Sequence, residues 1–380
     1  MPQSLPLLAL LLVIPLPALS QTTPGPNKEK ALALEQAKDL HGAEQAWQQV
    51  LTTAPNDPEA NAHLGLDYAL EGNYTQAVPA YRKALAASPD LPGVQLNLGL
   101  ALFKSAQLAD AIAPLTAAAA QTPADPRPKL LLGMAQYGTG HYADAIPNLR
   151  AGLDLTPNNL QLRLTLAQSC LWAKDYACAL EQDKLILQQD PNSAQADMIA
   201  GEALDAKGDI AGAVTQFRAA EGANPNTPDL HFGLGYLLWK QGNFAEAEPE
   251  FGKELQLDPN HTQALTYLGD LALKKNDWPT ARTTLERAAA QPNAVRLTFL
   301  DLGIVNAHDK RNPEAEADFK RAIQLAPEDP DAHYRLARLA QAMGNTEEAR
   351  TELAKVQQLH KAKDDVLVQK ITPPSTGVQH

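Results

Sequence analysis

Apolar residues of two sizes recur along the chain at intervals of 34 residues. Leu-Gly pairs show the period most clearly, and they lie at residues 64–65, 98–99, 132–133, 234–235, 268–269 and 302–303. Ten segments of this length fit without insertion or deletion, starting at residues 24, 58, 92, 126, 160, 194, 228, 262, 296 and 330. A fixed period of this length is typical of proteins built from stacked supersecondary units. We number the segments repeat 1 to repeat 10 and count positions from the first residue of each.

Each repeat predicts two helices in close contact. Position 20 is alanine in all ten repeats, position 8 is always Gly or Ala, and position 24 is bulky and apolar in nine. Small residues at positions 8 and 20 let two antiparallel helices approach closely, while large residues at positions 7 and 24 fill the space beside them. Asp or Asn at position 16 predicts an N-cap for the second helix, and proline at position 32 predicts its end. The N-cap candidates are Asp39, Asn73, Asp175, Asp209, Asn243, Asp277 and Asn345.

This pattern resembles the tetratricopeptide repeat (TPR) family, whose Leu-Gly pair, alanine, aromatic residue and terminal proline appear at matching offsets. The resemblance covers residues 24–363 and is strongest in residues 58–89, 228–259 and 296–327. It implies an all-α, right-handed superhelical solenoid of about ten helix-turn-helix units. The first helix of each unit would line a concave groove, and residues 364–380 would form a C-terminal cap or flexible tail.

Repeat 5 departs from the pattern. It carries Asp183 at position 24, where the other repeats have a bulky apolar residue. It also holds both cysteines of the chain, Cys170 at position 11 and Cys178 at position 19. A disulfide between them would stabilise this repeat by about 2.5 kcal/mol, if the stabilisation arises from chain entropy. Two separate thiols remain the alternative, because spacing alone does not establish the geometry that a disulfide needs.

In TPR proteins, ligands usually contact positions 2, 5, 9 and 12 of the first helix and their neighbours. Here these positions are apolar and aromatic in the middle of the array. The candidate groove residues are Leu96, Leu100, Phe103, Leu130, Met134, Tyr137, Trp172, Phe232, Tyr236, Trp239 and Tyr267. Phe232, Tyr236 and Trp239 form one stripe at helical spacing. The alternative for such residues is packing between the first helices of successive repeats.

Towards the C-terminus the predicted groove becomes polar, with Asp270, Asp301, Asp331, Arg335 and Arg338. The Lys and Asn residues with which some family members clamp a carboxylate terminus are absent from the matching positions. The resemblance therefore argues against a co-chaperone that binds the tails of heat-shock chaperones.

Charge and motifs exclude several function classes. The formal net charge is −12, and no cluster of Lys and Arg offers a site for phosphate backbones, so we expect no nucleic-acid partner. The common catalytic and nucleotide-binding signatures are absent. The nine histidines are scattered, with His63, His231 and His333 in first helices of different repeats. We expect solvated or groove-lining histidines, no metal, no cofactor and no enzymatic activity.

Residues 1–20 have the pattern of a signal peptide. An apolar run from Leu5 to Leu16 is shorter than a membrane span, and Ala18 and Ser20 are small residues suited to cleavage before Gln21. The run lacks a basic residue before it and contains two prolines, so an uncleaved membrane anchor or a misplaced start are the alternatives. We expect an exported protein, periplasmic or extracellular, without stable membrane insertion after cleavage.

These features predict a non-enzymatic scaffold that binds protein or peptide partners in its groove. By resemblance to exported TPR arrays, it would assist the assembly of bacterial envelope complexes. The alternatives are a carbohydrate-binding or exopolysaccharide-export accessory protein, for which the aromatic groove is the support, and an enzyme with an unrecognised site.

Overall fold

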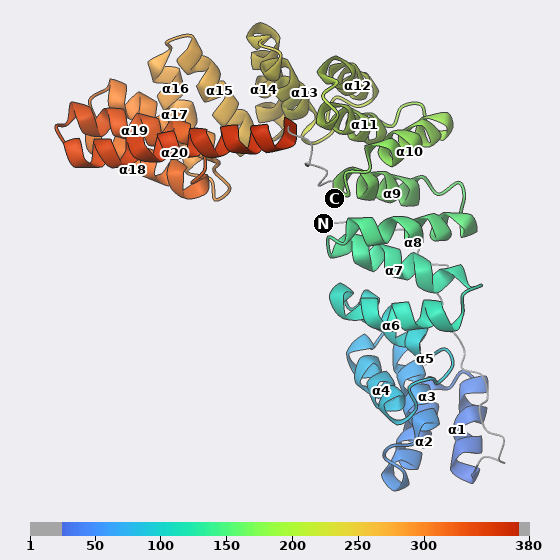
Figure 1. Ribbon diagram of the computed structural model, residues 1–380. Coiled ribbons are helices and arrows are strands. Elements are labelled where there is room, and N and C mark those ends of the chain that lie inside the picture. Colours follow the sequence, from blue (N-terminus) through green and yellow to red (C-terminus); the bar gives the residue numbers. More distant parts are fainter. Residues whose placement is uncertain (1–24, 372–380) are drawn as a thin grey trace, which may run out of the picture. The chain divides into compact units, whose positions relative to one another are not determined.

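The computed structural model describes residues 25–371, which form twenty α-helices and no strand (Figure 1). The predicted signal peptide lies outside the described residues. Odd-numbered helices are the first, or A, helices of the repeats, and even-numbered helices are the second, or B, helices. The A helices are α1 (Pro26–Gln36), α3 (Pro58–Leu70), α5 (Val94–Lys104), α7 (Pro126–Gly138), α9 (Leu160–Trp172), α11 (Ala194–Ala206), α13 (Leu230–Lys240), α15 (Thr262–Lys274), α17 (Arg296–His308) and α19 (Pro330–Ala342). The B helices are α2 (Leu40–Thr53), α4 (Tyr74–Ala87), α6 (Leu108–Gln121), α8 (Tyr142–Leu155), α10 (Tyr176–Gln189), α12 (Ile210–Ala223), α14 (Phe244–Leu257), α16 (Trp278–Ala289), α18 (Asn312–Leu325) and α20 (Thr346–Ile371).

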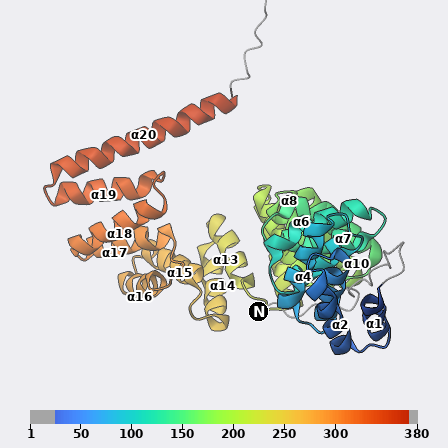
Figure 2. The same ribbon diagram turned by 90° about the horizontal axis from the view of Figure 1, so that it is seen from below.

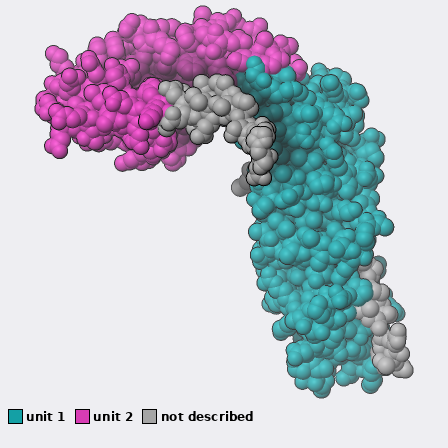
Figure 3. Space-filling model, viewed as in Figure 1, with its two compact units in different colours: residues 1–208 teal, residues 209–380 magenta. Residues whose placement is uncertain are grey.

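The chain divides into two compact units, residues 1–208 and 209–380 (Figure 3). The division falls inside repeat 6, between α11 and α12. Within each unit every helix packs on its neighbours in the chain, and several A helices also contact the A helix of the next repeat. In the second unit these A–A contacts join α13, α15, α17 and α19. The last helix, α20, has 26 residues and packs on α19 (Figure 2). The predicted all-α architecture of paired, stacked helices is confirmed.

The turn between the two helices of every repeat passes through one left-handed residue. It lies at position 15 in all ten repeats, with φ between 59° and 86°. Five of these residues are glycine, and the others are Lys38, Ala106, Lys174, Asn276 and Lys310. A left-handed residue after a helix closes it and redirects the chain, and glycine adopts this conformation without steric cost.

The predicted N-caps at position 16 are found in part. The side chains of Asp39, Asp175, Asp209 and Asp277 accept a hydrogen bond from the backbone amide three residues later. Asn345 does so at 3.3 Å. Asn73 and Asn243 do not cap their helices. The Thr75 hydroxyl donates to Oδ1 of Asn73 in place of a backbone amide. The side-chain amide of Asn243 donates to Glu246.

The contact between the two helices of a repeat is closer than the sequence pattern suggests. The large residue at position 24 lies directly over the glycine at position 8, not beside it. A Cβ added at Gly303 would meet the Phe319 ring at 2.5 Å, and one at Gly65 would meet the Tyr81 ring at 2.8 Å. The alanines at position 20 are almost completely buried. In the repeats with glycine at position 8, the helical hairpin therefore depends on the absence of a side chain there.

Repeat 5 has a polar residue, Asp183, at position 24 and a disulfide between its two helices. Asp183 is buried, its Oδ1 has no hydrogen-bond partner, and burial next to Asp197 raises its pKa to about 6. In the same hairpin Cys170 of α9 and Cys178 of α10 form a disulfide, with their Cα atoms 5.6 Å apart. The disulfide thus joins the two helices of the one repeat whose apolar contact is interrupted.

Among the described residues, no helix is both long and apolar enough to cross a membrane.

Candidate functional site

The predicted groove residues of the first unit divide into core and surface. Leu96, Leu100 and Leu130 are buried in the apolar core, so packing between A helices accounts for them. Three further residues, Phe103, Met134 and Tyr137, are partly buried against the same core.

Trp172 is 46% exposed at the end of α9. It stacks on Tyr137 of α7, with the ring centroids 5.8 Å apart, and contacts Tyr142 of α8 at 4.7 Å. The pair of Tyr142 and Trp172 has an equivalent in repeats 8 and 9, where Trp278 stacks on His308 with the ring centroids 3.7 Å apart. A ring at position 17 over position 13 of the next repeat is therefore a recurring packing feature.

The aromatic residues of the second unit gather in one cluster. Phe232, Tyr236 and Trp239 follow each other along α13, and Tyr267 projects from α15 against all three. The centroid of the Tyr267 ring lies 6.1 Å from that of Phe232, 5.5 Å from Tyr236 and 5.0 Å from Trp239. Burial, reinforced by nearby acidic and phenolic groups, raises the pKa of Tyr267 to about 12. The four predicted residues thus meet, and each is partly buried by the others.

Polar contacts hold Trp239 in one orientation. Its Nε1 donates a hydrogen bond of 2.6 Å to Oδ2 of Asp270 on α15. Lys274, one turn later on α15, forms an ion pair with the same carboxylate and lies over the Trp239 ring, 5.5 Å from a ring centroid. The indole is therefore fixed by residues that lie about 30 positions away, in the next repeat.

Beyond Trp239, a pocket of about 650 Å³ opens among α13, α15, α17 and α19. Its apolar wall consists of Leu273, Leu297, Leu300 and Ile304, and its rings are Trp239, Trp278 and Tyr334. Its charged residues are Asp270, Lys274, Arg296, Asp301, Asp331 and Arg335. We call this space the α13–α19 pocket. Of the predicted aromatic groove, Trp239 alone lines it, whereas four of the five polar residues predicted for the C-terminal groove do so.

Asp301 is the most unusual residue of the α13–α19 pocket. Its side chain is buried, with 4% of the residue exposed, and its Oδ2 has no hydrogen-bond partner. Burial, together with the charge of Asp270, raises the pKa of Asp301 to about 8 against the opposing effect of the nearby basic groups. A buried carboxyl oxygen without a partner is costly, and here the acid lies at the wall of a pocket that a ligand can enter.

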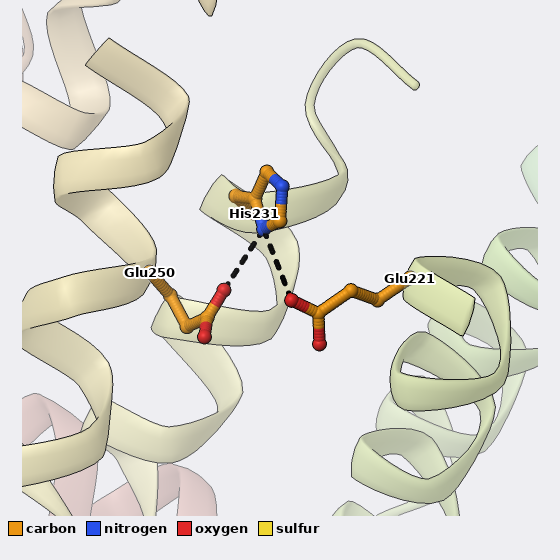
Figure 4. Close-up of side chains that lie close together, drawn as sticks. All are labelled: Glu221, His231 and Glu250. Carbon is orange, nitrogen blue, oxygen red and sulfur yellow. Dashed lines mark hydrogen bonds and ion pairs between the residues drawn. The ribbon is translucent and has the colours of Figure 1, made fainter. Parts of the chain in front are cut away.

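A second polar cluster of the second unit lies outside this pocket. His231 of α13 hydrogen-bonds through Nδ1 to Glu250 of α14 at 2.8 Å, and Glu221 of α12 lies 3.9 Å away (Figure 4). Although one His and two Glu could ligate a metal, Lys253 Nζ lies 2.7 Å from Glu221 and 2.8 Å from Glu250. The ammonium group of Lys253 thus lies between the two carboxylates, where a metal ion would have to bind. The other ring nitrogen of His231 bonds to the Pro225 carbonyl at 2.8 Å, so both nitrogens have protein partners.

The contact between His231 and Pro225 belongs to a series that the sequence pattern did not reveal. In six repeats the side chain at position 4 hydrogen-bonds to the carbonyl of the proline that ends the preceding repeat. The pairs are Asn61–Pro55, Gln95–Pro89, Lys129–Pro123, Arg163–Pro157, His231–Pro225 and His333–Pro327. The residue types differ, and what they share is a side-chain donor. A search for donors in place of identical residues would have found the series, which we call the proline latch.

A third cluster joins Asp229, Glu254 and His261. Glu254 of α14 accepts hydrogen bonds from the backbone amides of Asp229 and Phe232, so it caps the start of α13 from another helix. His261 accepts from the amide of Ala264 and bonds to Asp229. These residues are engaged in ending and starting helices.

Comparisons with known proteins agree with this architecture. Models of the tetratricopeptide repeat match residues 28–92 and 198–262 in one case, and residues 68–135, 136–203, 238–294 and 307–367 in the other. No curated protein matches the chain significantly.

Solved structures are similar at low sequence identity. The APC/C hetero-tetramer Cut9-Hcn1 matches with 15% identity and a TM-score of 0.51, over 88% of this chain and 80% of that chain. Yeast Tom70 matches with 14% identity and a TM-score of 0.40, over 92% and 96%. YrrB, described as a TPR protein with an unusual peptide-binding site, matches with 18% identity and a TM-score of 0.40, over 51% and 100%. The family models, which cover most of the described residues, show that this chain belongs to the tetratricopeptide repeat family.

Proposed function

We propose that this protein is a non-enzymatic scaffold that binds a peptide segment of a partner protein across the A helices of its second unit. TPR arrays typically act in protein–protein interaction, because stacked repeats present extended surfaces. The observation that carries the proposal is the α13–α19 pocket, which combines three aromatic rings with an unpartnered buried carboxyl. Aromatic rings at a partly apolar surface are frequent anchors of protein interfaces.

We further propose that the protein works outside the cytoplasm, in the assembly of bacterial envelope complexes. The apolar run in residues 1–20 supports export. The disulfide between Cys170 and Cys178 supports it independently, since disulfides persist in oxidising compartments.

The test is photo-crosslinking from a side chain that is already exposed in the pocket. Tyr334 is 46% exposed and lines the pocket, so a photoreactive phenylalanine should fit there without disturbing the core. Leu325, 41% exposed at the end of the B helix α18, is the matched control. We expect partner proteins to crosslink from position 334 in living cells and not from position 325. Crosslinking from position 325 and not from position 334 would contradict binding at the pocket.

Carbohydrate binding is a second candidate function, favoured by the exposed ring of Trp172 next to Tyr137 and Tyr142. A glycan array with the mature protein would test it. Binding that is lost in Trp172→Ala or Trp239→Ala would favour this function over peptide binding. Absence of glycan binding in the wild-type protein would remove it.

A further inference from the structure

The buried carboxyl of Asp301 indicates what the α13–α19 pocket recognises. Its Oδ2 is shielded from water and accepts no hydrogen bond from the protein. A carboxyl in this situation gains from a ligand that brings a hydrogen-bond donor, and it gains most from a donor that carries a positive charge.

The basic groups around Asp301 are partly engaged by other acids. Lys274 pairs with Asp270, and Arg296 pairs with Asp329 at 3.0 Å. Arg335 and Asp331 lie on α19 and are exposed. The pocket therefore contains three acids and three basic groups. Two of the acids, Asp270 and Asp301, are buried, and of these Asp301 has an oxygen without a hydrogen-bond partner. An anionic ligand would further oppose the ionisation of Asp301, whereas a cationic ligand favours it.

The rest of the pocket suits a long side chain with a charged end. Leu297, Leu300 and Ile304 supply an apolar wall for aliphatic carbons. Trp239 already carries the ammonium of Lys274 over its ring, which shows that a cation is compatible with this wall. Tyr334 offers a further exposed ring on which a planar guanidinium can stack.

We propose that the α13–α19 pocket receives an arginine or lysine side chain of the bound protein segment, with the charged end hydrogen-bonded to Asp301. The inference rests on the proposed function, because it names the side chain that a bound segment would insert. It adds a specificity rule: segments that place a basic residue at the pocket bind, and segments with a neutral isostere bind weakly.

Binding of a cation is linked to the ionisation of Asp301. In the free protein the pKa of Asp301 is raised to about 8, and a bound cation favours the ionised form. The carboxyl therefore releases a proton on binding below this pH, and affinity should increase as the pH rises towards 8. The other charged groups that face Asp301 are Asp270 and Lys274 of α15, Arg296 of α17, and Asp331 and Arg335 of α19.

The probes are two capped tripeptides, acetyl-Gly-Arg-Gly-amide and its citrulline counterpart, which has nearly the same shape and no charge. The full mature protein is labelled with ¹⁵N, and the indole signals of its four tryptophans are followed during titration. We expect the arginine peptide to shift the signals of Trp239 and Trp278, which line the pocket, and to leave those of Trp47 and Trp172 unchanged. The citrulline peptide should bind about tenfold more weakly or worse.

Asp301→Asn is the decisive variant, because asparagine resembles the protonated acid and should preserve the fold. It should reduce the affinity for the arginine peptide about tenfold and abolish the rise of affinity between pH 6.5 and 8. Asp331→Asn, which changes an exposed acid of the same pocket, should alter the affinity less than about threefold.

Equal binding of the two peptides, or no shift of the Trp239 and Trp278 signals by the arginine peptide, would overturn the inference. Both outcomes are distinct from failure of the proposed function, which is read from crosslinking at Tyr334. Partner crosslinks from Tyr334 without any preference for arginine would leave the scaffold in place and remove Asp301 as its specificity residue.

Discussion

At the scale of single residues, the turn between the two helices of a repeat requires a left-handed backbone conformation, although its residue type varies. Position 15 is left-handed in all ten repeats, yet glycine occupies only half of them. For other residue types this conformation costs about 1–2 kcal/mol, since the Cβ lies too close to a backbone oxygen. The surrounding helix packing must offset this cost at Lys38, Ala106, Lys174, Asn276 and Lys310.

This argument predicts that Ala106→Gly stabilises the protein, by about 0.5–1 kcal/mol, because the gain in the folded state exceeds the added freedom of the unfolded chain. The reverse change, Gly72→Ala, should destabilise it by a similar amount at the equivalent turn, where nothing lies within 4 Å of the added Cβ. Urea-unfolding midpoints of the two variants should move in opposite directions. Movement in the same direction would show that side-chain contacts, not backbone strain, dominate at this turn.

At the scale of helices, the proline latch joins six of the repeats to the repeat before them. The last proline of a repeat leaves its carbonyl in the turn, and a side chain from the start of the next A helix donates to it. His231 adds a second bond to Glu250 of α14, so it connects the preceding turn, its own helix and its B helix. His333 repeats this arrangement with Glu352 of α20.

His231→Ala should lower the free energy of unfolding by about 2–3 kcal/mol, because it leaves the buried Glu250 without its histidine partner. Gln95→Ala is the matched latch variant with an exposed and longer bond of 3.4 Å, and it should cost less than about 0.5 kcal/mol. Thermal or urea unfolding measures both. Equal losses in the two variants would mean that the proline contact, and not Glu250, carries the stabilisation.

A buried carboxyl between helices of the first unit predicts a dependence of stability on pH. Asp67 of α3 is fully buried, and its oxygens have no hydrogen-bond partner. Burial, with smaller effects of Glu35, Glu71 and Glu44, raises its pKa to about 8. The folded state thus favours the protonated form, so its contribution is fully present below about pH 4 and is lost as the pH rises to 8.

Asp67→Asn should therefore stabilise the protein at pH 8.5 relative to the wild type, and the difference should shrink as the pH falls towards 5. The difference in the free energy of unfolding between the two proteins should change by at most about 1.4 kcal/mol per pH unit. Melting temperatures of the two proteins across this range give the comparison. Parallel pH profiles would show that Asp67 does not titrate in this window.

At the scale of the whole molecule, stability is distributed over repeats that contact only their neighbours. One weak repeat can then interrupt the array, since no distant contact compensates for it. Repeat 5 combines the buried Asp183 with the disulfide between Cys170 and Cys178. We infer that the disulfide offsets the cost of the buried Asp183, so reducing it should weaken the first unit.

Denatured, unreduced protein should accordingly show no free thiol in an Ellman titration. The double variant Cys170→Ser/Cys178→Ser should be less stable by about 2.5 kcal/mol, as the chain-entropy model gives for so short a loop. Adding Asp183→Leu to this variant should restore part of the loss, because leucine occupies position 24 in other repeats. Two reactive thiols in the wild type would contradict the pairing.

Much of the helical hairpin could be predicted from the sequence, because the residues that determine it lie within one repeat and recur every 34 residues. The close contact at Gly303 and Phe319 follows from spacing on two adjoining helices. The candidate site was only partly predictable. Leu96 and Leu130 occupy groove positions by number, but neighbouring helices bury them. Tyr334 and Trp278 were not among the candidates. Tyr334 does occupy position 5, but Trp278 stands at the start of a B helix and reaches the pocket only through the packing of neighbouring repeats.

The sequence by itself determined the family, the helical pairs and the places where their backbones touch, because these depend on residue size and spacing within one repeat. Only the tertiary structure decided which polar groups of different repeats meet. Trp239 bonds to Asp270, 31 residues later, and Asp301 becomes a buried acid without a partner. Such meetings depend on how successive A helices cross and which rotamers fill the space between them, and a repeat pattern does not encode either.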